Sequence, residues 1–165
     1  VAGEYVYDGA LYACQNDDAK QRRSKRAVWG MAAILTVAVA AGGCIPAPGM
    51  QNCFYVLLPY LGEFLGAASV IWALAKLGTD WSTVREYNYK KSVAVLPVRT
   101  AVTAVFSLLG IVCELIFFFV NDHAGQTFFA LLYVLLKLIA LLSVLVLRAE
   151  IMQAEWDKLP KKNNF

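Results

Sequence analysis

Four apolar stretches, each about as long as a membrane crossing, limit what this chain can fold into. They cover residues 27–45, 54–75, 97–120 and 127–147. A helix needs roughly 17–25 mostly apolar residues to cross the hydrocarbon core of a bilayer. Membrane-spanning strands would instead show alternating polarity over about ten residues, and these stretches do not alternate. We therefore predict an all-α integral membrane protein, a bundle of four transmembrane helices in antiparallel up-down order.

The composition supports this prediction and excludes an ordinary soluble domain. Hydrophobic residues make up 59% of the 165 residues, whereas soluble domains contain roughly half or fewer. The expected organisation is an N-terminal segment 1–26, a four-helix domain 27–147 with an interfacial loop 76–96, and a C-terminal helical extension 148–165.

The basic residues predict the orientation of the bundle. All 15 Lys and Arg residues lie before the first stretch, at or between the second and third, after the fourth, or, for Lys137, within the fourth. The connections 46–53 and 121–126 contain none. The positive-inside rule then places both termini and the loop 76–96 in the cytoplasm of a plasma or inner membrane. Anionic lipid headgroups account for such a charge distribution, so we expect the bilayer as partner and no nucleic acid.

The connections between the spans have different characters. The first outer connection, 46–53, contains two prolines, a glycine and no charge, which predicts a tight turn. In the loop 76–96, Asp80 can cap a short helix that runs from Trp81 towards Lys91. We expect this aromatic helix to lie in the inner membrane interface.

The two terminal segments suggest docking elements. The Tyr-rich segment 1–26 suits a surface-lying or partner-bound segment better than a folded domain. After residue 147, Met152 and Trp156 continue an apolar stripe at helical spacing until Pro160. We therefore expect the fourth helix to protrude into the cytoplasm.

Three ionisable side chains fall inside the predicted spans: Glu63, Glu114 and Lys137. A charge at such a position costs several kcal/mol on insertion scales unless it is paired or hydrated. Counted from the outer helix ends at 1.5 Å per residue, the three lie at depths of roughly 13, 9 and 15 Å. They can share one layer in the outer half of the bundle.

Helical spacing extends this layer into a polar face on three of the spans. On the second span, Gly62 and Gly66 form a G-x-x-x-G spacing beside that face, which lets a neighbouring backbone approach closely, and the Ala- and Gly-rich first helix is the neighbour we expect. The predicted polar cluster comprises Glu63 and Tyr60 on the second span, Arg99, Thr103, Ser107 and Glu114 on the third, and Tyr133 and Lys137 on the fourth.

Two interpretations of this cluster remain open from the sequence. In the first, Lys137 bridges Glu63 or Glu114, and the layer only fixes the register of the helices. In the second, two acids facing one base leave one glutamate to hold a proton, as a proton-coupled transporter or a cation site requires.

Cys44 and Cys53 form a second candidate pair, because both lie near helix ends on the predicted outer side. They form either a structural disulfide or two free thiols. Redox catalysis is less well supported, because catalytic pairs usually have C-x-x-C spacing.

Other chemistry is poorly supported by the sequence. His123 is the only histidine and lies with Asp122 in a short turn, so we predict no metal site. The chain lacks the nucleotide-binding, hydrolase and metalloprotease motifs. We expect no cofactor and no enzymatic activity, with membrane thiol oxidoreduction as the minor alternative.

These observations lead to two hypotheses about function. The first is an accessory or regulatory subunit of a larger membrane assembly, because three segments could dock a protein partner or a second copy. The alternative is a small, oligomeric, proton-coupled transporter or channel that uses Glu63, Glu114 and Lys137.

Overall fold

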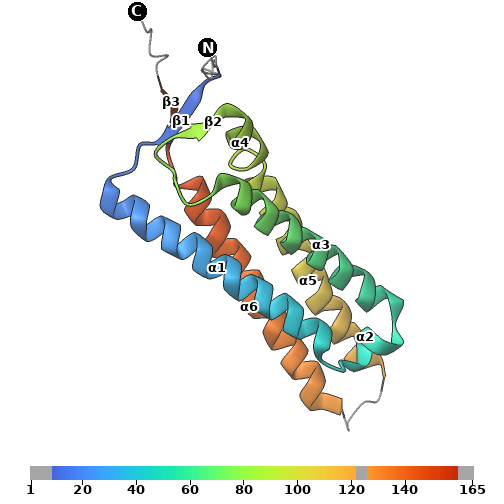
Figure 1. The fold of residues 1–165 in the computed structure, drawn as a ribbon. Coiled ribbons are helices and arrows are strands. Elements are labelled where there is room, and N and C mark those ends of the chain that lie inside the picture. The colour runs from blue at the N-terminus through green and yellow to red at the C-terminus, as the bar shows by residue number, and fades with distance from the viewer. Residues whose placement is uncertain (1–8, 122–125, 160–165) are drawn as a thin grey trace, which may run out of the picture.

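The computed structural model describes residues 9–121 and 126–159. Within these residues, four long helices lie side by side in antiparallel order (Figure 1). Each contains a stretch long and apolar enough to cross a membrane. The helices are α1 (Asp18–Cys44), α3 (Phe54–Leu77), α5 (Leu96–Val120) and α6 (Thr127–Met152).

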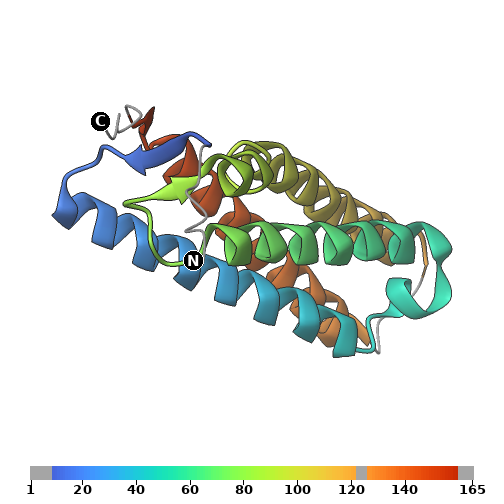
Figure 2. The same ribbon diagram turned by 45° about the horizontal axis from the view of Figure 1, so that its top comes forward.

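The helix pairs do not contact one another equally. Helix α6 packs along both α1 and α5, and α5 also packs along α3, whereas α1 and α3 have a smaller contact. Figure 2 shows the four helices along the length of the bundle. We call its two ends the sheet end, where α1 and α5 begin, and the α2 end, where α3 and α6 begin.

A small antiparallel sheet at the sheet end corrects the all-α prediction. Strand β1 (Leu11–Cys14) lies between β2 (Val84–Arg85) and β3 (Trp156–Lys158). Tyr12 is the central residue, opposite Val84 on one side and Lys158 on the other. The protein is therefore mostly helical, but its N-terminal segment, middle loop and C-terminal segment fold together.

The helix bounds differ from the prediction mainly at this end. Helix α1 already begins at Asp18, so the charged residues from Asp18 to Arg26 are helical. Helix α6 ends at Met152, and the predicted continuation to Pro160 is wrong because the chain turns and enters β3. Residues 1–8, the start of the predicted Tyr-rich segment 1–26, and residues 160–165 lie outside the described residues.

The loop 76–96 contains a shorter helix than predicted. Helix α4 comprises only Glu86–Lys91. Asp80 does not cap it, because its carboxylate accepts hydrogen bonds from the backbone N–H and hydroxyl of Ser82. Trp81 is only 1% exposed and belongs to the core rather than to an interfacial helix.

Aromatic rings hold the three segments of the sheet end together. Tyr12 of β1 and Tyr89 of α4 stack in parallel with ring centroids 4.2 Å apart. Trp156 of β3 lies 5.9 Å from Tyr89 and 5.8 Å from Trp81. Aromatic pairs at such distances each stabilise by about 0.5–1.5 kcal/mol beyond the burial of their area. Tyr12, Trp81, Tyr89 and Trp156, which belong to the predicted docking segments, therefore pack against one another.

The opposite end is closed by a short helix where the sequence predicted only a turn. Helix α2 (Pro48–Asn52) begins with a proline, whose missing N–H costs nothing at that position. It packs against α3 and α5. Ala47, Pro48 and Gly49 are buried, since this uncharged connection can fold inward over the helix ends.

Candidate intramembrane site

The described structure joins three of the predicted cluster residues in one buried network. Lys137 of α6 donates to Oε2 of Glu63 on α3, forming an ion pair. The hydroxyl of Ser107 on α5 donates to the other carboxylate oxygen of Glu63 at 2.6 Å. All three residues are at most 2% exposed. The network therefore links α3, α5 and α6 in the half of the bundle nearer the α2 end.

Two aromatic rings complete the surroundings of the Lys137 ammonium group. Its Nζ lies 4.6 Å from the ring centroid of Tyr60 and 5.1 Å from that of Tyr133, within the range of cation–π attraction. Gly110 of α5 lies beside this side chain, and a β-carbon there would make an ordinary contact at 3.5 Å from Lys137 Cε. The long side chain can thus reach α3 through the interior of the bundle.

Glu114 lies apart from this ion pair. Its Oε1 accepts a hydrogen bond from the backbone N–H of Gly49 on α2 at 3.3 Å. Within the described residues, its Oε2 has no hydrogen-bond partner, and neither has the hydroxyl of Tyr133. Both side chains are fully buried. Lys137 is therefore paired with Glu63, and the carboxyl group of Glu114 is a second buried acid outside this pair.

Close packing by α2 and a small crevice define the surroundings of Glu114. A β-carbon at residue 49 would overlap the Glu114 carboxylate, so glycine is the residue that fits there. Between α5 and α6, a crevice of about 20 Å³ reaches Glu114. Its lining consists of Glu114, Leu115, Phe118, Ala130, Leu131 and Val134.

Arg99 and Thr103 belong to the polar face of α5 but not to this network. Arg99 donates to the carbonyl of Ser69 on α3 at 2.7 Å, and Thr103 donates to the carbonyl of Arg99 at 2.8 Å. Both lie nearer the sheet end. They satisfy backbone carbonyl groups along the contact between α3 and α5.

The partner of the G-x-x-x-G spacing is α5, and the expectation of α1 is wrong. A β-carbon at Gly66 would lie 3.3 Å from Thr103 Cα, and one at Gly62 would overlap the ring of Phe106. Helix α1 instead meets α3 through Tyr60, whose hydroxyl donates to the Val39 carbonyl at 3.4 Å. The long α3–α5 contact explains the difference.

The two cysteines of the candidate pair lie at neighbouring helix ends. Cys44 ends α1 and is exposed, Cys53 directly precedes α3, and the two are free thiols in this structure. Among residues 9–121 and 126–159, no group of His, Cys, Asp and Glu side chains could hold a metal ion. Asp122 and His123 lie outside the described residues.

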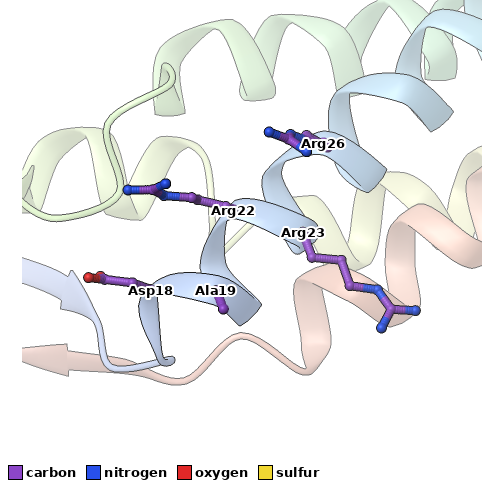
Figure 3. A pocket seen from close by; sticks show the side chains of 5 residues that line it. All are labelled: Asp18, Ala19, Arg22, Arg23 and Arg26. Atoms are coloured by element: carbon purple, nitrogen blue, oxygen red, sulfur yellow. The ribbon is translucent and has the colours of Figure 1, made fainter.

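Basic side chains gather on α1 at the sheet end. A surface pocket of about 540 Å³ is lined by Asp18, Ala19, Arg22, Arg23 and Arg26. Figure 3 shows that Arg23 extends away from Arg22 and Arg26, so the three guanidinium groups do not converge on one point. This arrangement suits contact with many headgroups better than one bound anion.

Sequence reasoning missed one member of the site, the backbone N–H of Gly49. Its position in an uncharged, proline-containing connection was visible, but its contact with Glu114, 65 residues later, was not. Comparison of the chain with protein-family models, curated proteins and solved structures gave no match.

Proposed function

We propose that this chain is an accessory or regulatory subunit of a larger membrane assembly. The observation that carries the proposal is the ion pair between Lys137 and Glu63, completed by Ser107. These groups satisfy one another between three helices, and such pairing commonly fixes register rather than performing chemistry. A bundle held together in this way suits a protein that works through association.

The same proposal includes a location and an orientation. We place the protein in the plasma or inner membrane, with the sheet end in the cytoplasm. The support is that the described basic residues outside the bundle interior lie on segments at the sheet end, while α2 carries no charge. Basic residues are retained on the cytoplasmic side during insertion.

Crosslinking in the native membrane tests the association. Crosslinked protein extracted in mild detergent should have a mass above that of a single chain, with a constant partner or a second copy. The matched control is the double variant Glu63→Gln with Lys137→Met, which removes both buried charges together. It should still assemble. A lone chain after crosslinking in native membranes would contradict the proposal.

A second function is favoured by one specific observation, the unpartnered Oε2 of Glu114. A carboxyl group without a counter-charge in a hydrocarbon environment is expected to hold a proton. We therefore propose, as the alternative, a proton-coupled transporter or channel. The crevice of about 20 Å³ beside Glu114 has room for little more than one water molecule, so any larger pathway would have to form between copies.

Proton flux into liposomes tests this alternative. Purified protein is reconstituted with a pH-sensitive dye inside the vesicles, and a potential is applied. Glu114→Gln should abolish the flux attributable to the protein, because an amide cannot carry the proton. Glu86→Gln, at the sheet end, is the matched control and should leave it unchanged. Equal flux in the original chain and in Glu114→Gln would contradict the alternative.

A further inference from the structure

Glu114 Oε2 and the Tyr133 hydroxyl are buried polar atoms that lack hydrogen-bond partners among the described residues. Lys137 cannot compensate Glu114, because it is bound to Glu63. An ionised carboxylate buried without a counter-charge costs more than a neutral one. Glu114 is thus the carboxyl group of the bundle best suited to hold a proton.

Among the described residues, the groups that face Glu114 add no second charge. Helix α2 contributes the Gly49 N–H and has no ionisable side chain. The neutral groups Tyr55 of α3, Tyr133 of α6 and Cys113 of α5 lie within electrostatic range of this site. The buried cation Lys137 is already paired with Glu63.

The crevice indicates the side from which Glu114 can be reached. Apart from Glu114, its lining is apolar and comes only from α5 and α6. Leu131, which lines it, is 62% exposed on the surface that the bilayer would cover. The crevice has a volume of about 20 Å³, so it is a narrow apolar opening beside Glu114.

We propose that Glu114 is a proton-binding site that is reached from the lipid-facing side of the bundle through the crevice between α5 and α6. The ligand is a proton, and the Tyr133 hydroxyl is the nearby hydrogen-bonding group. The inference rests on the second proposed function, because it takes from it that Glu114 holds a proton. It does not require a net flux of protons across the membrane.

Carbodiimide labelling tests this site directly. Dicyclohexylcarbodiimide partitions into bilayers and adds to protonated carboxyl groups, so its product can be located by mass spectrometry. In liposomes at neutral pH, Glu114 should be labelled at least tenfold faster than Glu63. Labelling should fall as the pH rises, because deprotonation removes the reactive form. A water-soluble carbodiimide should leave Glu114 unlabelled, and Glu114→Gln should lack the product.

A pair of variants on α6 tests the route. Leu131→Trp places a large ring in the crevice and should slow labelling of Glu114 about tenfold. Leu138→Trp is the matched control, because Leu138 is also exposed but does not line the crevice. It should leave the labelling rate unchanged.

The results that overturn the proposal are equally distinct. Absence of label at Glu114, equal labelling of Glu63, or equal labelling by the water-soluble reagent would each refute the site. Because the unsubstituted chain is mapped, these outcomes do not depend on any variant folding. Labelling of Glu114 without proton flux supports the proton-binding site and contradicts the transporter or channel function. If proton flux depends on Glu114 but the membrane-soluble carbodiimide does not label it, the second function is supported and the route through the crevice is refuted.

Discussion

Lys137 of α6 forms its ion pair with Glu63 of α3, across the interior of the bundle, and Glu114 of the adjacent helix α5 has no counter-charge among the described residues. The two interpretations of the polar cluster therefore apply to different carboxyl groups. The pair Glu63–Lys137 has the arrangement of a structural link between helices. Glu114 has the arrangement expected of a group that holds a proton.

The orientation can be tested with the chain's own cysteine at the α2 end. Cys44 is exposed there, whereas Thr83 is exposed at the sheet end. In intact cells, a membrane-impermeant maleimide should label Cys44 and should not label a Thr83→Cys variant that lacks the other cysteines. Opening the cells should make residue 83 reactive. The reverse pattern would invert the proposed orientation.

Replacement of Gly66 by alanine should loosen the contact between α3 and α5. The added methyl group would lie 2.6 Å from Thr103 Oγ1 and 3.3 Å from Thr103 Cα, so the Thr103 side chain and the α5 backbone must shift. Overpacking of this kind costs roughly 1–3 kcal/mol. The free energy of unfolding in mixed detergent micelles should fall by that amount.

The matched control for this variant is Gly30→Ala on α1. No atom lies within 4 Å of a β-carbon at Gly30. Because alanine is the better helix former, this variant should be neutral or more stable by up to about 1 kcal/mol. Equal losses in both variants would show that Gly66 has no special contact.

The aromatic cluster at the sheet end should contribute strongly to stability. Trp81 is 1% exposed, whereas Trp72 is 64% exposed at the same end of α3. Trp81→Ala should lower the free energy of unfolding by about 3–5 kcal/mol, as large-to-small core substitutions do. Trp72→Ala should have a smaller effect in detergent. A smaller loss for Trp81→Ala than for Trp72→Ala would contradict the observed packing.

Acidification should weaken the contact between the N-terminal segment and α4. Hydrogen bonds from Lys90 at 2.7 Å and from the Ala10 N–H hold the pKa of the Glu86 carboxyl below its ordinary value. A lowered pKa stabilises the folded form above the ordinary pKa, and that contribution is lost as the pH falls through the folded value.

The measurement for this prediction is hydrogen exchange at the Ala10 amide. After correction for the intrinsic rate, exchange should accelerate as the pH falls below about 4, near and below the usual Glu pKa. Glu86→Gln should remove this pH dependence. If both proteins show the same profile, the carboxylate does not hold Ala10.

The sequence predicted the four spans because hydropathy over about 20 residues depends little on tertiary contacts. It did not predict the sheet. Strands such as Val84–Arg85 are too short to show alternation, and Tyr12 pairs with residues far along the chain. The same limit hid the α2 helix, whose burial depends on the ends of α3 and α5.

The members of the polar cluster were predictable from helical spacing, but their pairing was not. Glu63 and Glu114 lie at similar depths, so either could have met Lys137. In the structure, Glu63 receives hydrogen bonds from both Lys137 and Ser107, whereas Glu114 receives one from the Gly49 N–H. Such contacts are set by helix rotation and adjacency, which a single sequence does not show.

The most direct test of this account is a rescue experiment on Lys137. Lys137→Met alone leaves Glu63 buried without its counter-charge and should destabilise the bundle by about 3–5 kcal/mol. The stability of two double variants in detergent is then compared. Lys137→Met with Glu63→Gln should recover most of the loss, whereas Lys137→Met with Glu114→Gln should recover little. Rescue by Glu114→Gln as strong as that by Glu63→Gln would contradict the assignment of Lys137 to Glu63.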